Sequence, residues 1–115
     1  MKWGDAAPLI QTALDHQDTH RLVDVLDAIE QGQAQLWTTE NSCAVTEIIE
    51  YPSGARKARV WLAAGKRAEL LTMLNDIEIW AKDERCTSVY IVGRRGWKRI
   101  LKDYKEPHTM LEKVL

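Results

Sequence analysis

The sequence predicts an α/β fold with a mixed sheet, in which an antiparallel meander is followed by a βαβ unit with flanking helices. Three observations support this prediction. Two short stretches with helical spacing open the chain, strand-like segments separated by turn residues follow, and a long amphipathic stretch then stands between two more strand-like segments. We assign residues 1–115 to a single domain, because this length suits one hydrophobic core.

The first two elements are predicted to be amphipathic helices. One covers residues 8–16, with Pro8 in its first turn, where proline is well tolerated. The other begins at a cap formed by Asp18 or Thr19 and runs to about Gln31, just before a glycine. Leucine, isoleucine and valine recur in both at helical spacing, so each helix is expected to pack one face onto the rest of the domain.

The next three elements are predicted strands at residues 35–39, 43–51 and 56–63, separated by turns. Their order predicts an antiparallel meander. Alternation in the third strand predicts one face with Ala58, Val60 and Leu62 and another with Lys57, Arg59 and Trp61.

A long helix is predicted over residues 66–84, followed by a short buried strand at 88–92. A helix between two strands makes a βαβ unit, so strands 56–63 and 88–92 should be parallel neighbours. A short helix is then expected at 97–104, and Pro107 blocks its continuation. Residues 108–115 are predicted to form a last strand.

Composition narrows the functional classes. No apolar run approaches the length of a membrane span, and the first residues lack the basic-then-apolar pattern of a secretion signal. Charge is unevenly placed, since residues 1–50 carry a net −7 and residues 51–115 a net +6. Such a chain can pair its own halves, or present an acidic face to one partner and a basic face to another.

The C-terminal part of the sequence resembles a known group. The residues that carry the resemblance are Ile91-Val92-Gly93-Arg94-Arg95-Gly96-Trp97-Lys98-Arg99-Ile100-Leu101, followed by Tyr104 and a short predicted final strand. This tail is similar to that of small phage-encoded proteins related to acetyltransferases. The element order of nearly the whole chain also resembles the GNAT (N-acetyltransferase) superfamily, whose active members use acetyl-CoA.

The resemblance implies a cofactor site at the start of the long helix. In active members the equivalent of strand 56–63 bonds the pantetheine arm through its backbone, and a glycine-rich loop cradles the pyrophosphate. On this chain pantetheine would face Leu62, Ala63 and Ala64, and the phosphates would lie at Gly65, Lys66 and Arg67. The loop here is shorter and lacks the second glycine, so a plain strand-to-helix turn is the alternative interpretation.

Catalytic groups are less clearly indicated. Tyr104 falls where the superfamily has an aromatic of a Gly-Phe/Tyr pair, and Asp103 replaces the glycine, so Tyr104 is interpreted as a packing residue. Glu47 and Glu50 lie near the place where a base could sit, although solvated strand residues are the simpler interpretation. The catalytic residues are therefore unknown, and the scattered histidines predict no metal site.

The densest basic cluster follows strand 88–92. We interpret four of its residues as a partner-binding surface: Arg94, Arg95, Lys98 and Arg99. A solvated helix face is the alternative. Nucleic acid is a less favoured partner, because the whole chain carries a net charge of −1.

Two functions remain open at this point. The favoured one is a non-catalytic phage protein with a GNAT-like fold, which needs no cofactor and acts by protein contacts or self-association in the virion or on a host factor. The alternative is an acyl-CoA-dependent N-acyltransferase that moves an acetyl group from acetyl-CoA to an amine. Either would work in the host cytoplasm or the virion, without a membrane or a metal.

Overall fold

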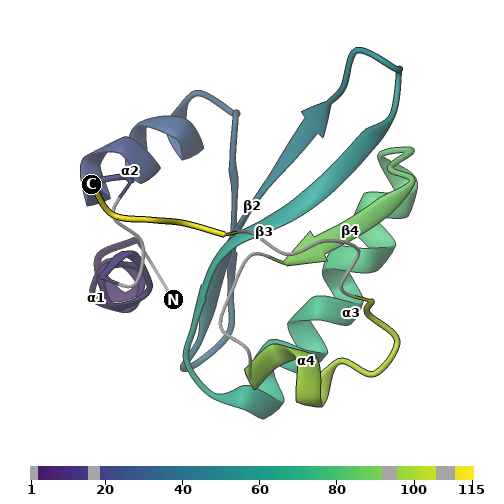
Figure 1. Cartoon of the computed structure of the whole chain (residues 1–115). Helices are drawn as coiled ribbons and strands as arrows, with labels where there is room; N and C mark the ends of the chain where they lie inside the picture. The colour runs from purple at the N-terminus through teal and green to yellow at the C-terminus, as the bar shows by residue number, and fades with distance from the viewer. Residues whose placement is uncertain (1–2, 16–18, 92–95, 106–110) are drawn as a thin grey trace.

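The computed structural model describes residues 3–15, 19–91, 96–105 and 111–115. Four strands form one sheet in the order β1-β2-β3-β4, with two helices on each side (Figure 1). This is the mixed α/β architecture that the element order predicts. The elements are α1 (Trp3–Leu14), α2 (Leu22–Glu30), β1 (Gln35–Thr38), β2 (Cys43–Glu50), β3 (Arg56–Ala64), α3 (Arg67–Asp83), β4 (Ser88–Ile91) and α4 (Gly96–Ile100).

Helix α1 starts earlier than the sequence predicts. It begins at Trp3, so Pro8 lies inside the helix and not in its first turn. The helix tolerates this proline because Ala6 and Ile10 on either side of it are buried, and their packing outweighs one missing N–H donor. Tertiary burial therefore sets this boundary.

Helix α2 is capped in a different way from the prediction. Its N-cap is Arg21, whose N–H donates to the carboxylate of Asp24 at 2.8 Å. An acidic side chain in the first turn also suits the helix dipole. At the other end, Gly32 adopts a φ of 75°, which is the left-handed conformation expected of a stop signal.

Strands β1, β2 and β3 form the predicted antiparallel meander. The register of β2 and β3 shifts by one residue, because Val45 pairs with Leu62 whereas Thr46 pairs with Val60. Trp61 is thus the extra residue of a β-bulge. The bulge overturns the predicted alternation: Trp61 and Leu62 both pack in the cluster under α1 and α2, whereas Val60 packs against α3.

The βαβ unit is confirmed. β3 and β4 are parallel, with pairs from Lys57↔Ser88 to Val60↔Ile91, and α3 packs across them. Pairing of the described residues ends there, although β3 continues to Ala64.

The sheet separates two apolar clusters. One, under α1 and α2, contains Ile10, Val25, Val45 and Leu62. Cys43 belongs to it, and its thiol donates to the carbonyl of Ala6 at 3.9 Å. The other lies between the sheet and α3 and α4 and includes Leu70, Met73, Leu74, Ile77 and Leu101.

The C-terminal part departs most from the prediction. α4 ends at Ile100, and the chain continues as turns through Asp103. Residues 111–115 form no strand, and Leu111, Val114 and Leu115 are 91%, 88% and 110% exposed. The predicted strand therefore fails for these residues, while residues 108–110 lie outside the described part. Its apolar side chains find no cover in the folded chain, which explains the failure.

Candidate functional site

The predicted cofactor site lies where β3 turns into α3, and this junction is bonded to the β1–β2 turn. Gly65 has a φ of 128° and lies against Ser42, so a Cβ at Gly65 would be only 2.3 Å from the Ser42 hydroxyl oxygen. That hydroxyl is buried and accepts the N–H of Lys66 at 2.8 Å. A backbone donor that an anion would need is therefore already satisfied within the chain.

A second contact fixes the same turn to the first turn of α3. The carboxylate of Glu69 accepts the hydroxyl of Thr39, the N–H of Asn41 at 3.0 Å and the side-chain amide of Asn41 at 3.2 Å. The hydrogen bond from Thr39, followed by those from Asn41, lowers the pKa of Glu69 below its usual value. We call these contacts of Thr39, Asn41 and Ser42 with Lys66 and Glu69 the α3 latch.

The latch makes the α3 N-terminus a poor cradle for pyrophosphate. The ionised Glu69 places negative charge in the turn whose free N–H groups would otherwise attract an anion. Lys66 and Arg67 are exposed and supply positive charge, but glycine occurs only once in the loop. In this conformation the residues present do not fit the diphosphate of a coenzyme.

The other predicted cofactor residues, on strand β3, do not share one face of the sheet. Leu62 is buried toward α1 and α2, because of the bulge at Trp61. Ala63 packs on the α3 side, and Ala64 pairs with Cys43 of β2. The structure thus places Leu62 and Ala63 on opposite faces of the sheet, while Gly65 and Lys66 lie at the turn that contacts Ser42.

The space next to Ala63 is small. A cavity of about 20 Å³ lies between β3, β4, α3 and α4. This is room for about one water molecule, whereas pockets for drug-sized ligands measure roughly 300–1,000 Å³. Its lining is apolar: Ala44, Val60, Ala63, Leu70, Met73, Leu74, Ile77, Ile91 and Trp97.

A larger, open hollow of about 340 Å³ lies at the other end of β3. Its walls are Arg56, Asp83, Glu84 and Arg85. Arg56 is already engaged, since its Nε donates to the Glu84 carbonyl at 2.8 Å and its guanidinium pairs with Glu50. The hollow is therefore a polar surface feature far from the predicted site along β3.

Tyr104, Glu47 and Glu50 each have a side-chain partner. The Tyr104 hydroxyl donates to the Glu78 carboxylate at 3.1 Å, and burial followed by this negative charge raises the pKa of Tyr104. Glu47 pairs with Arg59 at 2.7 Å, and Glu50 pairs with Arg56. Tyr104 also packs on the α3 cluster, in line with its interpretation as a packing residue.

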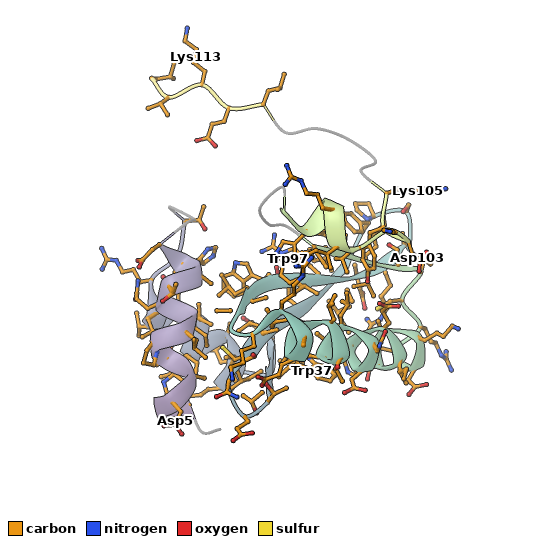
Figure 2. All side chains as sticks on the ribbon, turned by 90° about the horizontal axis from the view of Figure 1, so that it is seen from below. Asp5, Trp37, Trp97, Asp103, Lys105 and Lys113 are labelled. Carbon is orange, nitrogen blue, oxygen red and sulfur yellow. The ribbon has the colours of Figure 1, made fainter. Side chains whose placement is uncertain are left out.

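Exposed charges of both signs occur on the described helices. Lys102 and Lys105 are exposed after α4, together with Arg99, whereas Asp24 and Asp27 are exposed on α2. Figure 2 shows Asp5 on α1 and Lys105 on opposite sides of the molecule. Of the predicted partner-binding residues, Arg99 is exposed, and Arg94, Arg95 and the side chain of Lys98 lie outside the described part.

Two kinds of feature are absent from the described residues. No group of three or more histidine, cysteine, aspartate or glutamate residues there could hold a metal ion. Within the same ranges, no helix is both long and apolar enough to cross a bilayer.

Sequence reasoning misses Ser42 and Glu69. Glu69 carries a weak signal, because an acidic residue three positions after the N-cap of a helix commonly accepts a nearby N–H. Ser42 carries none, since its partner Lys66 lies 24 residues away and the contact depends on the paired strands.

No protein-family model matches this chain, and no curated protein matches it. Its structure is similar to that of a Bacillus halodurans protein solved as a tetramutant, with a TM-score of 0.73 at 9% identity, covering 98% of this chain and 94% of that one. It is also similar to a ribosomal-protein-alanine N-acetyltransferase from Brucella melitensis biovar Abortus, with a TM-score of 0.66 at 9% identity over 97% and 91% of the two chains.

A third similar structure is an aminoglycoside 6′-N-acetyltransferase from Acinetobacter haemolyticus, with a TM-score of 0.63 at 12% identity over 100% of this chain and 94% of that one. At identities this low, the likeness shows the fold and not the activity. The chain has a mixed α/β sheet with flanking helices, as N-acetyltransferases of the GNAT type have.

Proposed function

We propose that this chain is a non-catalytic protein with a GNAT-like fold that acts through protein contacts. Following the resemblance of its tail, we place that role in a phage virion or on a host factor. The observation that carries the proposal is the α3 latch, in which Ser42 accepts the N–H of Lys66 and the carboxylate of Glu69 accepts donors of Thr39 and Asn41.

The latch opposes coenzyme binding for two physical reasons. The Lys66 N–H is already satisfied at 2.8 Å, so an incoming phosphate would have to displace a buried hydroxyl. The ionised carboxylate of Glu69 would also repel the phosphate.

The small cavity next to Ala63 also supports a non-catalytic function. The cavity of about 20 Å³ has only apolar walls, and Trp97 is one of the residues that line it. A pantetheine arm would need this cluster to open, which would expose apolar surface to water at a cost of roughly 25 cal/mol per Å².

The surface offers contacts in place of a cofactor. We propose that the basic residues Arg94, Arg95, Lys98 and Arg99 bind an acidic protein surface, supported by the exposed Arg99, Lys102 and Lys105 nearby. Charges concentrated on one side favour a charged partner and speed its association.

The test is binding of acetyl-CoA, followed by thermal unfolding and titration calorimetry. We expect no stabilisation at millimolar acetyl-CoA. Occupancy at about 100 times the dissociation constant would add about 2.7 kcal/mol and raise the melting temperature clearly.

The control variants reverse charge at exposed positions. Lys66→Glu with Arg67→Glu changes the α3 N-terminus, and Lys82→Glu changes the far end of the same helix. A stabilisation by acetyl-CoA that is lost in the first variant and kept in the second would contradict the proposal.

One observation favours the acyltransferase alternative. The described β3–β4 pairing stops at Val60↔Ile91 while β3 runs on to Ala64, and a bulge lies between these points. In active members of the superfamily, the equivalent strand offers its backbone to pantetheine. Acetyl transfer to an amine in the same preparations, absent from the Lys66→Glu, Arg67→Glu variant, would establish this alternative.

A further inference from the structure

Strand β1 is an unprotected edge of the sheet. The order β1-β2-β3-β4 begins there, and among the described residues only β2 pairs with it. Residues 31–39 contain no charged side chain and no proline, which are the features that usually keep a free edge from pairing with another chain. Figure 2 shows Trp37 of this strand on the side of the molecule away from Lys113 and the C-terminal segment. The edge is therefore open to a strand from outside.

The hydrogen-bonding pattern of the ladder identifies the open backbone groups of β1. The N–H of Thr39 donates to the carbonyl of Ser42 at 2.9 Å, so Thr39 and every second residue before it direct their N–H and C=O groups toward β2. Alternation then directs the groups of Leu36 and Thr38 away from the sheet. Within the described ranges these outward groups have no hydrogen-bond partner.

Trp37 gives this edge an aromatic anchor. Its indole N–H donates to the hydroxyl of Thr46 at 2.9 Å, and its ring packs edge-to-face on Trp80 of α3 with the centroids 5.5 Å apart. Both tryptophans remain partly exposed, although the polar group of Trp37 is satisfied inside the chain. Trp37 therefore offers apolar ring surface at the edge, and tryptophans in such positions commonly carry much of the binding energy of an interface.

One antiparallel register uses all the open groups of two identical strands. Pairing Leu36 of one copy with Thr38 of the other, and the reverse, joins the outward N–H and C=O groups and places the two Trp37 side chains opposite each other. A shift toward the N-terminus would need the N–H of Ala34, which already donates to a carbonyl of α2 at 3.1 Å. A shift in the other direction would bring in Glu40, an exposed residue whose charge is costly to bury.

We infer that two copies of this chain join through their β1 edges into one continuous sheet, with Leu36 paired with Thr38 and Trp37 at the two-fold axis. The occupant is a second copy because the edge is self-complementary in its backbone groups and carries no charge that would repel an identical strand. This contact is independent of the proposed function, since it uses neither the basic residues after β4 nor the α3 latch.

The experiment measures the mass of the full chain by sedimentation equilibrium between roughly 1 and 200 µM, the range of weak dimers, at roughly 0.5 M salt, which screens contacts driven by charge. The test variant is Thr38→Lys, which places a charge at an exposed position of the edge. The matched control is Ser88→Lys, because Ser88 is the exposed residue of β4, the strand at the opposite edge of the sheet. Hydrogen exchange of the β1 amides is followed in the wild type at both ends of the concentration range.

We expect a concentration-dependent dimer for the wild type and for Ser88→Lys, and a dimer about tenfold weaker or more for Thr38→Lys. In the wild type the amides of Leu36 and Thr38 should be protected only at high concentration, whereas the amide of Trp37, which faces β2, should be protected throughout.

A wild type that stays monomeric throughout this range would overturn the inference. So would a dimer that Thr38→Lys leaves intact, or one that Ser88→Lys weakens as strongly. Amides of Leu36 and Thr38 that exchange as freely at high concentration as at low concentration would overturn it as well, because they would place the contact away from β1.

Discussion

Gly65 is the residue at which conformation and packing are both constrained. Its φ of 128° is unfavourable for any residue with a Cβ, and that Cβ would meet Ser42 at 2.3–2.5 Å. Gly65→Ala should therefore lower the free energy of unfolding by about 2–3 kcal/mol.

The control for that change is Gly54→Ala. Gly54 also has a positive φ, 89°, but nothing lies within 4 Å of its Cβ position. It should cost only about 1 kcal/mol, the conformational part. Urea unfolding of both variants measures the difference, and equal losses would show that the contact with Ser42 has no energetic weight.

Glu69 gives the α3 latch a pH dependence. Its pKa is lowered in the folded chain by the hydrogen bonds from Thr39 and Asn41, so its contribution is present above the unfolded pKa of about 4.5 and is lost as pH falls through the lower folded value. Glu69→Gln should therefore reduce stability at pH 7, and the two proteins should converge in acid. Urea unfolding between pH 2.5 and 7, a window around the ordinary glutamate pKa, measures this. A difference that stays constant over the whole range would contradict the assigned ionisation.

Trp97 is the side chain through which helix α4 packs on the cluster between the sheet and α3. It packs on the α3 cluster and lines the cavity of about 20 Å³, and α4 has only five residues. Trp97→Ala should cost about 3 kcal/mol by loss of apolar contact and enlargement of the cavity. Equilibrium unfolding followed by circular dichroism is the measurement, with Ile79→Ala as the exposed control. A loss below about 0.5 kcal/mol would mean that α4 docks without this side chain.

The elements that sequence predicts best are those with long, regular patterns. The meander, the parallel β3–β4 pair and α3 follow from alternation, turn residues and the crossover rule. The face of Leu62 is mispredicted because a bulge adds one residue at Trp61, and no local pattern marks it. The start of α1 is mispredicted because burial of Ala6 overrides the preference of Pro8.

The candidate site was less predictable than the fold. The residues around Gly65 were identified through a resemblance, but the latch depends on Ser42, which strand pairing brings to Lys66 from 24 residues away. Likewise, the position of Tyr104 in the tail gives no sign of its hydrogen bond to Glu78, which lies 26 residues away. Contacts between distant segments have no short-range signal in one sequence.

Charge separation acts on the whole molecule. With −7 on residues 1–50 and +6 on residues 51–115, copies can attract one another head to tail at low salt. Replacing Arg94, Arg95, Lys98 and Arg99 by Gln should weaken partner binding or self-association and reduce its salt dependence, with the fold intact. Sedimentation velocity at low and high salt checks this. Large species that ignore both salt and these changes would indicate an apolar interface.

The thiol of Cys43 lies where α1 packs on the sheet. Because it is buried, the rate at which it is alkylated reports how often α1 separates from the sheet. Burial raises its pKa to about 11, so at pH 8 only roughly one thiol in a thousand is ionised, and an alkylating reagent must wait until α1 separates from β2. Cys86 is partly exposed and serves as an internal standard in the same tube. The ratio of their labelling rates therefore reports how often the α1 side of the sheet opens in the native protein.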